Sequence, residues 1–398
     1  MRKRCSRGLV AMSALVLCGC ESMPSWMPSF PTIPPPSLSW FGFGRDKNKP
    51  GPLPAFDAKI TARVNWQVPL GAKGGESFVP AARPDAIYAA APDGTIVSVD
   101  PASGRQIWRI KADKPLSAGI GAQSTVIAVG TAKGEVIAFD STGKPLWRVK
   151  VSTEVAGPPK AVEGKVIVWA LDGRIYGLSE TDGSQKWVYQ RTLPPLTVRR
   201  FAGGSTSRGA LFTGTAGGKL LALDLNTGAL GWEASVATPK GATELERIAD
   251  VTSAPVVEDR QVCAAAFQGR IACFDPTRGT LIWSRDFSSL GGIAVDSRYL
   301  YVTDDKGSIH ALDKITGTSI WKQDKLAARF PSGPVVLGDS VGVVDGEGYL
   351  LLLDHTDGNL IGRVATDGSA ALSQPAAVGN AAIWQSAGGT LISASVAP

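Results

Sequence analysis

The sequence is poor in the residues that most metal sites and nucleophilic sites need. Its 398 residues include two histidines, His310 and His355, and five cysteines that form no Cys-x-x-Cys pair. A zinc site is therefore not expected, because such sites use clustered cysteine and histidine ligands. No apolar run reaches the roughly 18 residues that a membrane-spanning helix requires, which excludes a polytopic membrane protein.

Sequence signatures of enzyme sites are also missing. The chain has no Gly-x-Ser-x-Gly turn, no phosphate-binding glycine loop and no run of metal ligands. Of the two histidines, His310 lies within a repeated strand pattern and His355 lies in a turn. We therefore predict that the protein is not an enzyme, and that it has no catalytic residue, metal site or cofactor site.

Residues 1–19 have the form of a secretory signal peptide. Basic residues at the start precede a short apolar stretch, residues 9–17. The stretch ends in Leu17-Cys18-Gly19-Cys20, which resembles a bacterial lipoprotein cleavage box and predicts that Cys20 is lipidated. Glu21 follows Cys20, at the position where an aspartate signals inner-membrane retention in the lipoproteins that this segment resembles. We therefore expect a lipid-anchored protein on the periplasmic face of the outer membrane.

The signal peptide also accounts for most of the positive charge. Removing residues 1–19 takes four basic residues from a net charge of +6 and leaves about +2. Nucleic-acid binding would need a clustered basic face, so no nucleic-acid partner is predicted. The next segment, residues 20–56, is rich in proline. It is interpreted as an extended tether that reaches up to roughly 100 Å at about 3.1 Å per residue.

Residues 57–398 repeat a unit of turn glycine, apolar strand, aspartate, second turn and tryptophan. The leading glycines of the copies are spaced by 38 to 51 residues. This period is typical of four-stranded β-propeller blades. The copies have their turn glycines at Gly94, Gly134, Gly173, Gly218, Gly269, Gly307, Gly348 and Gly389.

The first and last copies predict how the ring closes. The seventh copy has Gly362 in place of tryptophan, and the eighth ends after its first strand pattern. Trp66, near the start of the repeat region, would supply the tryptophan that the eighth copy lacks. We therefore predict an all-β, eight-bladed propeller of four-stranded antiparallel blades, in which an N-terminal strand completes the C-terminal blade.

The repeat resembles the tryptophan-docking motif of quinoprotein-type eight-bladed propellers. The motif Ala-x-Asp-x-x-x-Gly-x-x-x-Trp is found from Ala222 to Trp232 and from Ala311 to Trp321. The resemblance implies that each tryptophan packs on a neighbouring blade, and it is nearly silent on function. The predicted docking residues are Trp66, Trp108, Trp147, Trp187, Trp232, Trp283 and Trp321.

Two cysteines lie on the two arms of one predicted hairpin. A two-residue turn would place Cys263 and Cys273 on opposite faces, whereas a three-residue loop ending at Gly269 would place them directly opposite and allow a disulfide. The oxidising compartment permits a disulfide, and two reduced core thiols are the alternative.

Two insertions interrupt the repeat, at residues 193–209 and 238–257. Insertions in such arrays collect on one face, which is often the binding face. The first insertion contains Leu196, Val198 and Arg199, an apolar group with an arginine of the kind enriched at protein interfaces.

Together these features resemble the BamB family of propeller lipoproteins from the outer-membrane β-barrel assembly machinery. The stretch 196–199 resembles one family loop, and 244–252 resembles its acidic neighbour, with Thr252 in place of a family aspartate. The resemblance implies a scaffold that binds the periplasmic domains of the barrel-inserting subunit, BamA. It further implies that the protein aids membrane insertion, with nascent outer-membrane proteins as further partners.

In that interpretation Leu196 and Val198 anchor the partner, Arg199 pairs with an acid on it, and Asp250 contacts a base. Two alternatives are a quinone-cofactor dehydrogenase of the periplasm and a generic protein-binding propeller of the cell envelope. The dehydrogenases carry adjacent cysteines and calcium ligands, and the sequence contains no Cys-Cys pair.

Overall fold

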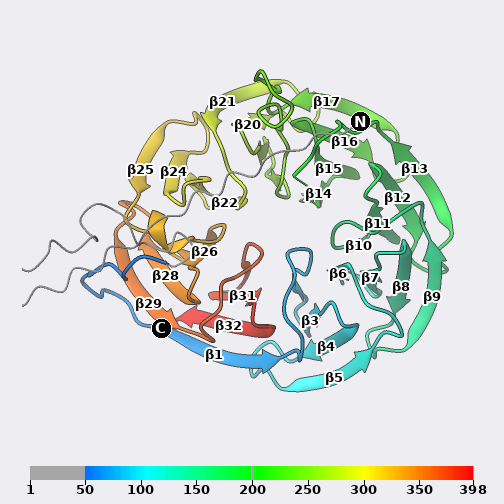
Figure 1. The fold of residues 1–398 in the computed structure, drawn as a ribbon, viewed down its shortest axis with the longest axis horizontal. Coiled ribbons are helices and arrows are strands. Elements are labelled where there is room, and N and C mark those ends of the chain that lie inside the picture. Colours follow the sequence, from blue (N-terminus) through cyan, green and yellow to red (C-terminus); the bar gives the residue numbers. More distant parts are fainter. Residues whose placement is uncertain (1–49, 123, 199–200, 202, 398) are drawn as a thin grey trace, which may run out of the picture. The chain divides into compact units, whose positions relative to one another are not determined.

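The repeat region forms a closed ring of eight blades (Figure 1). The computed structural model describes residues 50–122, 124–198, 201 and 203–397, so the signal peptide, Cys20 and most of the tether lie outside the described residues. Each blade is a four-stranded antiparallel sheet, which confirms the predicted fold class. Among the described residues, no helix is long and apolar enough to cross a membrane.

Blades 1 to 4 follow one another along the chain, each with its innermost strand first. Blade 1 contains β2 (Ala81–Ala82), β3 (Ile87–Ala90), β4 (Thr95–Val99) and β5 (Gln106–Lys111). Blade 2 contains β6 (Ala118–Gly121), β7 (Ile127–Gly130), β8 (Glu135–Phe139) and β9 (Pro145–Lys150). Blade 3 contains β10 (Lys160–Val162), β11 (Lys165–Trp169), β12 (Arg174–Ser179) and β13 (Gln185–Gln190). Blade 4 contains β14 (Gly204–Ser207), β15 (Ala210–Thr215), β16 (Lys219–Asp224) and β17 (Leu230–Ser235).

Blades 5 to 8 continue the same order. Blade 5 contains β18 (Val256–Val257), β19 (Val262–Ala265), β20 (Gly269–Phe274) and β21 (Leu281–Phe287). Blade 6 contains β22 (Ile293–Val295), β23 (Tyr299–Thr303), β24 (Ile309–Asp313) and β25 (Ser319–Gln323). A short 3-10 helix, η2 (Ala327–Arg329), precedes blade 7, which contains β26 (Val335–Leu337), β27 (Ser340–Val344), β28 (Tyr349–Asp354) and β29 (Leu360–Ala365). Blade 8 contains β30 (Ala376–Val378), β31 (Ala381–Gln385), β32 (Thr390–Val396) and β1 (Ala62–Pro69).

The ring closes as the sequence predicts. Strand β1, near the start of the described chain, pairs antiparallel with the last strand, β32 (Figure 1). Trp66 lies on β1 opposite Ser393 and thus occupies the tryptophan position of the eighth blade. Closure gives both faces of every blade a neighbour, which is why the middle strands are almost wholly buried and apolar.

All seven predicted docking tryptophans make the same contact with the next blade. Each indole Nε1 donates a hydrogen bond of 2.8 to 3.0 Å to a backbone carbonyl one blade further along. Each ring also lies against the glycine in the second turn of that blade's repeat, as Trp187 does against Gly228 and Trp321 against Gly358. The tryptophans therefore join neighbouring blades, as the motif implies.

The motif requires a small residue at its first position for a steric reason. Within a blade, each docking tryptophan lies opposite a small residue of the neighbouring strand, for example Ala222 opposite Trp232 and Gly177 opposite Trp187. A Cβ atom built on Gly177 would lie 2.1 Å from the ring of Trp187. Blade 7 reverses the pair, with Leu352 opposite Gly362, so one large and one small side chain are kept.

The repeated aspartates are turn-forming residues. The Asp224 carboxylate accepts hydrogen bonds from the backbone N–H groups of Asn226 and Thr227, at 3.0 and 2.8 Å. The Thr227 side chain donates a further bond, and these bonds hold the pKa of Asp224 below its ordinary value. Such bonds fix the tight turn that receives the tryptophan of the preceding blade.

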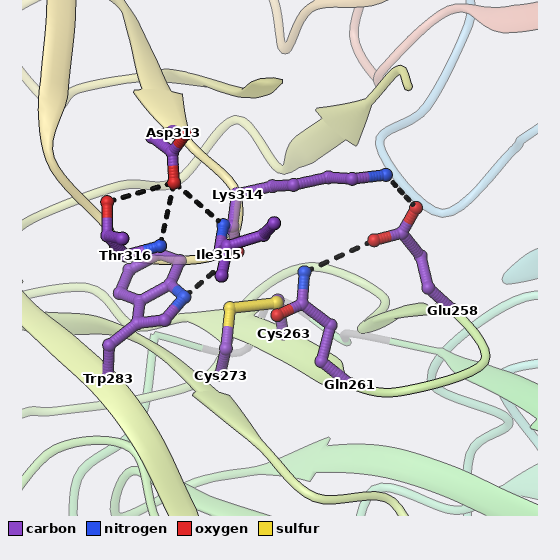
Figure 2. The surroundings of a disulfide bond; sticks show 9 residues. All are labelled: Glu258, Gln261, Cys263, Cys273, Trp283, Asp313, Lys314, Ile315 and Thr316. Carbon is purple, nitrogen blue, oxygen red and sulfur yellow. Dashed lines mark hydrogen bonds and ion pairs between the residues drawn. A yellow bond between two sulfur atoms is a disulfide. The ribbon is translucent and has the colours of Figure 1, made fainter. Parts of the chain in front are cut away.

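Blade 5 contains a disulfide bond between Cys263 and Cys273 (Figure 2). The two residues are directly opposite on β19 and β20, which is the register of the three-residue hairpin loop rather than the two-residue turn. Both side chains are buried, and Cys273 also lies opposite the docking residue Trp283. Trp283 donates to the carbonyl of Lys314 at 3.0 Å, so the disulfide adjoins the junction with blade 6.

Replacing Cys263 and Cys273 together by alanine is expected to lower the free energy of unfolding by about 2–3 kcal/mol, because the bond closes a loop between residues 10 apart. Urea unfolding of the oxidised wild type and of the double variant would measure the difference. Equal midpoints and equal slopes would contradict a stabilising bond. Wild type unfolded with reductant present provides the matched control, because it should lose the same free energy.

Candidate partner-binding face

Two long connections define one face of the ring. The first insertion loop (191–203) joins β13 to β14, and the second insertion loop (236–255) joins β17 to β18. Both run from an outermost strand to the innermost strand of the next blade, so they lie at the same end of the ring, which we call the loop face. They meet a central depression of about 630 Å³ there, to which they contribute Phe201 and Thr252.

The first insertion loop exposes part of its predicted contact group. The Leu196 side chain is 45% exposed although it is apolar, and Val198 is half-buried. Arg199 lies outside the described residues. Below the loop lies a small cavity of about 60 Å³ between blades 3 and 4. Its lining includes Trp169, Tyr189, Leu193, Thr197, Phe201 and Asp250.

The structure places Asp250, for which the sequence predicts a contact with a base on the partner, beneath the first insertion loop. The residue is 3% exposed. One carboxylate oxygen accepts a hydrogen bond from the N–H of Val198 at 2.7 Å, and the other accepts one from Gly217 at 2.9 Å. A buried carboxylate needs such donors. Asp250 therefore joins the second insertion loop to the first and holds the backbone of Val198 in place.

Thr252 also points into the protein. It is buried, and its hydroxyl donates to the carbonyl of Ser289 at 3.3 Å. The Thr252 side chain therefore joins the second insertion loop to the segment that contains Ser289.

The second insertion loop presents an apolar residue that the sequence analysis missed. Leu245 is 67% exposed at the tip of a single turn. The turn is held by a reciprocal cap, because Glu246 N–H donates to the Thr243 hydroxyl at 3.2 Å and Thr243 N–H donates to the Glu246 carboxylate at 3.2 Å. The N–H of Thr243 is the main cause that lowers the pKa of Glu246. The Thr-x-x-Glu spacing is the sequence signal that predicts such a turn.

The described residues do not fit the quinone cofactor of the propeller dehydrogenases. The disulfide joins cysteines on two opposed strands of blade 5, away from the depression, and the sequence has no adjacent cysteine pair. No group of three His, Cys, Asp or Glu side chains gathers into a possible metal site within the described part of the chain. The two insertion loops expose the large apolar side chains of Leu196 and Leu245 beside charged residues such as Lys240 and Arg247.

Comparison with known proteins places these features in one family. The family model described as outer membrane protein assembly factor BamB matches residues 92–323 and 306–397. A protein of that name from Nitrosomonas eutropha is 44% identical over 310 residues, covering 78% of this chain and 76% of the relative. One from Bordetella pertussis is 40% identical over 355 residues, covering 89% and 92%.

A solved structure agrees with the sequence relatives. The crystal structure of BamB from Moraxella catarrhalis superposes with a TM-score of 0.77 at 27% identity, covering 84% of this chain and 99% of the other. The family model spans most of the ring, and the relatives extend over most of both chains. This chain therefore belongs to the family of the outer membrane protein assembly factor BamB.

Proposed function

We propose that this protein is a non-catalytic scaffold for the assembly of outer-membrane β-barrel proteins. Its loop face would bind the periplasmic domains of a BamA-like barrel-inserting subunit, and a lipid on Cys20 would hold it at the periplasmic side of the outer membrane. Family membership supports the general role, because the relatives are named as outer membrane protein assembly factors. The partner and the anchor are our inference from the sequence.

The observation that carries the proposal is the coupling of the two insertion loops through Asp250. One buried carboxylate bonds Val198 of the first loop and Gly217 of blade 4 while belonging to the second loop. This arrangement presents two apolar side chains, Leu196 and Leu245, from braced loops on the same face. Preorganised apolar anchors cost less ordering entropy on binding than flexible ones do.

Each residue then has a distinct role. Leu196 and Leu245 would enter pockets on the partner, and Arg199 would pair with an acidic side chain of it. Asp250 would act indirectly as a positioning residue, because its carboxylate holds the backbone of Val198.

Leu196→Asp is expected to weaken binding of the purified barrel-inserting subunit by about 2 kcal/mol or more, roughly 30-fold in Kd, because a charge would be buried in place of an apolar anchor. Calorimetric titration with the subunit's periplasmic domains measures the change. Arg199→Glu should also weaken binding.

The matched control is Ile315→Asp. Ile315 is an exposed apolar residue in the β24–β25 turn, at the end of the ring opposite the loop face. It should bind like wild type. Equal loss in both variants would indicate general damage, and no loss at Leu196 or Arg199 would reject the site. Failure of wild type itself to bind would reject the partner.

A second binding role is favoured by the perimeter of the ring. The outermost strands expose apolar side chains next to the docking tryptophans, namely Ile107, Leu146, Leu230, Leu281, Ile282 and Ile320. In the described part of the chain these strands pair with another strand on one side only, so an extended segment of a nascent outer-membrane protein could add to the other side as a further strand. Hydrogen exchange of β5 and β25 with and without an unfolded outer-membrane protein tests this role, and unchanged exchange would reject it.

A further inference from the structure

The ring holds a segment that the sequence assigns to the tether. Leu53 and Phe56 pack against the core cluster of blades 6 and 7. The N–H of Gly51 donates to the carbonyl of Ala328, within η2, at 2.7 Å. The part of the chain attached to the ring therefore begins by residue 51, before the boundary at residue 57 that the sequence indicates. We call residues 50–61 the strap.

The end of the strap that leads into β1 takes the place of a missing docking tryptophan. In blade 7 the tryptophan position is Gly362, and a Cβ atom built there would lie 3.0 Å from both Ile60 Cγ1 and the Ile60 carbonyl oxygen. The N–H groups of Lys59 and Ile60 both donate to the carbonyl of Ile361, at 2.9 and 3.2 Å. A tryptophan at 362 would have no acceptor turn, because the two outer strands of blade 8 come from opposite ends of the repeat region. Ile60 fills that space instead.

The N-terminal end of the strap is bound by a buried arginine. Arg329 is 2% exposed, and it bonds the carboxylate of Asp345 at 2.9 and 2.6 Å and that of Glu347 at 2.8 Å. Its remaining amino group donates to the carbonyl of Gly51. The strap thus provides both an acceptor for the guanidinium and the cover that keeps it from water. A buried charge needs this full set of partners.

The strap reaches the ring at the rim of the loop face. A Cβ atom on Gly346 would lie 3.0 Å from Pro50 and 3.5 Å from Phe330. Phe330 also lines the central depression to which Phe201 and Thr252 of the two insertion loops contribute. From there the strap runs along β29, where Arg363 lies over the Phe56 ring at 5.1 Å, and it joins β1 at the opposite end.

We infer that the strap fixes the exit of the lipid tether at the loop face, so that the membrane anchor and the partner-binding loops act from the same face of the ring. The inference rests on the proposed function for the anchor at Cys20 and for the two loops. If the tether left the ring at the face opposite the loop face, part of its length would be needed to pass round the ring. Exit at the loop face leaves its whole length for positioning that face at the membrane.

Distance measurements between pairs of spin labels test the exit point in the full mature protein. One label at Pro52→Cys is paired with Lys306→Cys or with Ile315→Cys, which are exposed positions in turns at opposite ends of β24. Cys263 and Cys273 are joined and do not react with the label. We expect narrow distance distributions, with the shorter distance to position 306. Broad distributions, or a shorter distance to position 315, would overturn the inference. No partner is needed, so this outcome is independent of partner binding.

Limited trypsin digestion tests whether the strap is held. Cleavage after the exposed Lys59 requires local opening, because its N–H and that of Ile60 are bonded to Ile361. The double variant Leu53→Ala/Phe56→Ala should be cleaved there roughly tenfold faster, because it loses apolar packing that holds the strap. Ile320→Ala, an exposed apolar change on β25, should match wild type. Rapid cleavage of wild type at Lys59, or equal rates in the Leu53/Phe56 variant and wild type, would overturn the inference.

Discussion

Trp187→Ala is expected to lower the free energy of unfolding by about 3–5 kcal/mol, as large aromatic-to-alanine changes in cores do. The side chain is buried between blades 3 and 4, against Gly177 of its own blade and Gly228 of the next. Its Nε1 donates to the carbonyl of Leu225 at 3.0 Å. The variant would lose this bond, leave a buried carbonyl without its donor and open a cavity between two rigid sheets that cannot collapse to fill it.

The effect would be measured by urea unfolding, followed by intrinsic fluorescence and circular dichroism. Val188→Ala is the matched control, because Val188 is the next residue on β13 and its side chain is exposed. It should change stability by less than about 0.5 kcal/mol. If Trp187→Ala unfolds within the error of the control, the docking contact does not stabilise the junction between blades.

The closed ring should transmit this damage beyond one blade. In an open array each repeat contacts only its neighbours, and local loss stays local. Here β1 and β32 join the two ends of the array, so opening the junction between blades 3 and 4 also removes the constraint that closure imposes on the other blades. A single cooperative transition is therefore expected for both wild type and Trp187→Ala.

The repeat made the ring predictable because its pattern reports contacts that recur in every blade. A tryptophan, a small residue opposite it and an aspartate turn in the next blade form one steric unit. Trp66 identified the closing strand because the eighth copy lacks its own tryptophan. The same reasoning located the insertion loops, since added residues in a closed ring can only extend the connections between strands.

Other features depend on contacts that no local pattern encodes. The sequence predicts that Asp250 contacts a base on a partner, but it does not reveal that Asp250 is buried and accepts a hydrogen bond from the backbone of Val198, 52 positions away. The pairing of Cys263 with Cys273 depends on a one-residue difference in loop length, and the sequence is compatible with either loop. The strap was missed because proline predicts an extended chain equally well for a solvated tether and for a segment lying on a surface.

Arg329→Ala is expected to lower the free energy of unfolding by about 3–5 kcal/mol, comparable with the effect at Trp187. Arg329 is the main partner of Asp345, whose side chain is completely buried, and it also bonds Glu347 and the strap. Without the guanidinium, the Asp345 carboxylate would be a buried charge that lacks its counter-charge. Urea unfolding measures the loss. Arg363→Ala, which removes an exposed arginine of β29 that contacts Phe56 of the strap, should lose less than about 1 kcal/mol.

A double-mutant cycle separates the cost of the unpaired charge from the loss of strap contacts. Arg329→Met/Asp345→Asn removes both charges and keeps similar side-chain volume, so it should recover part of the stability that Arg329→Met loses. Trypsin cleavage after Lys59 should be faster than in wild type in both Arg329→Met and the double variant, because both lack the bond from Arg329 to the Gly51 carbonyl. If stability and protection of Lys59 were restored together, the arginine would act only by neutralising Asp345. If stability alone returns, the guanidinium has two separable roles: it balances a buried carboxylate, and it holds the strap on the ring.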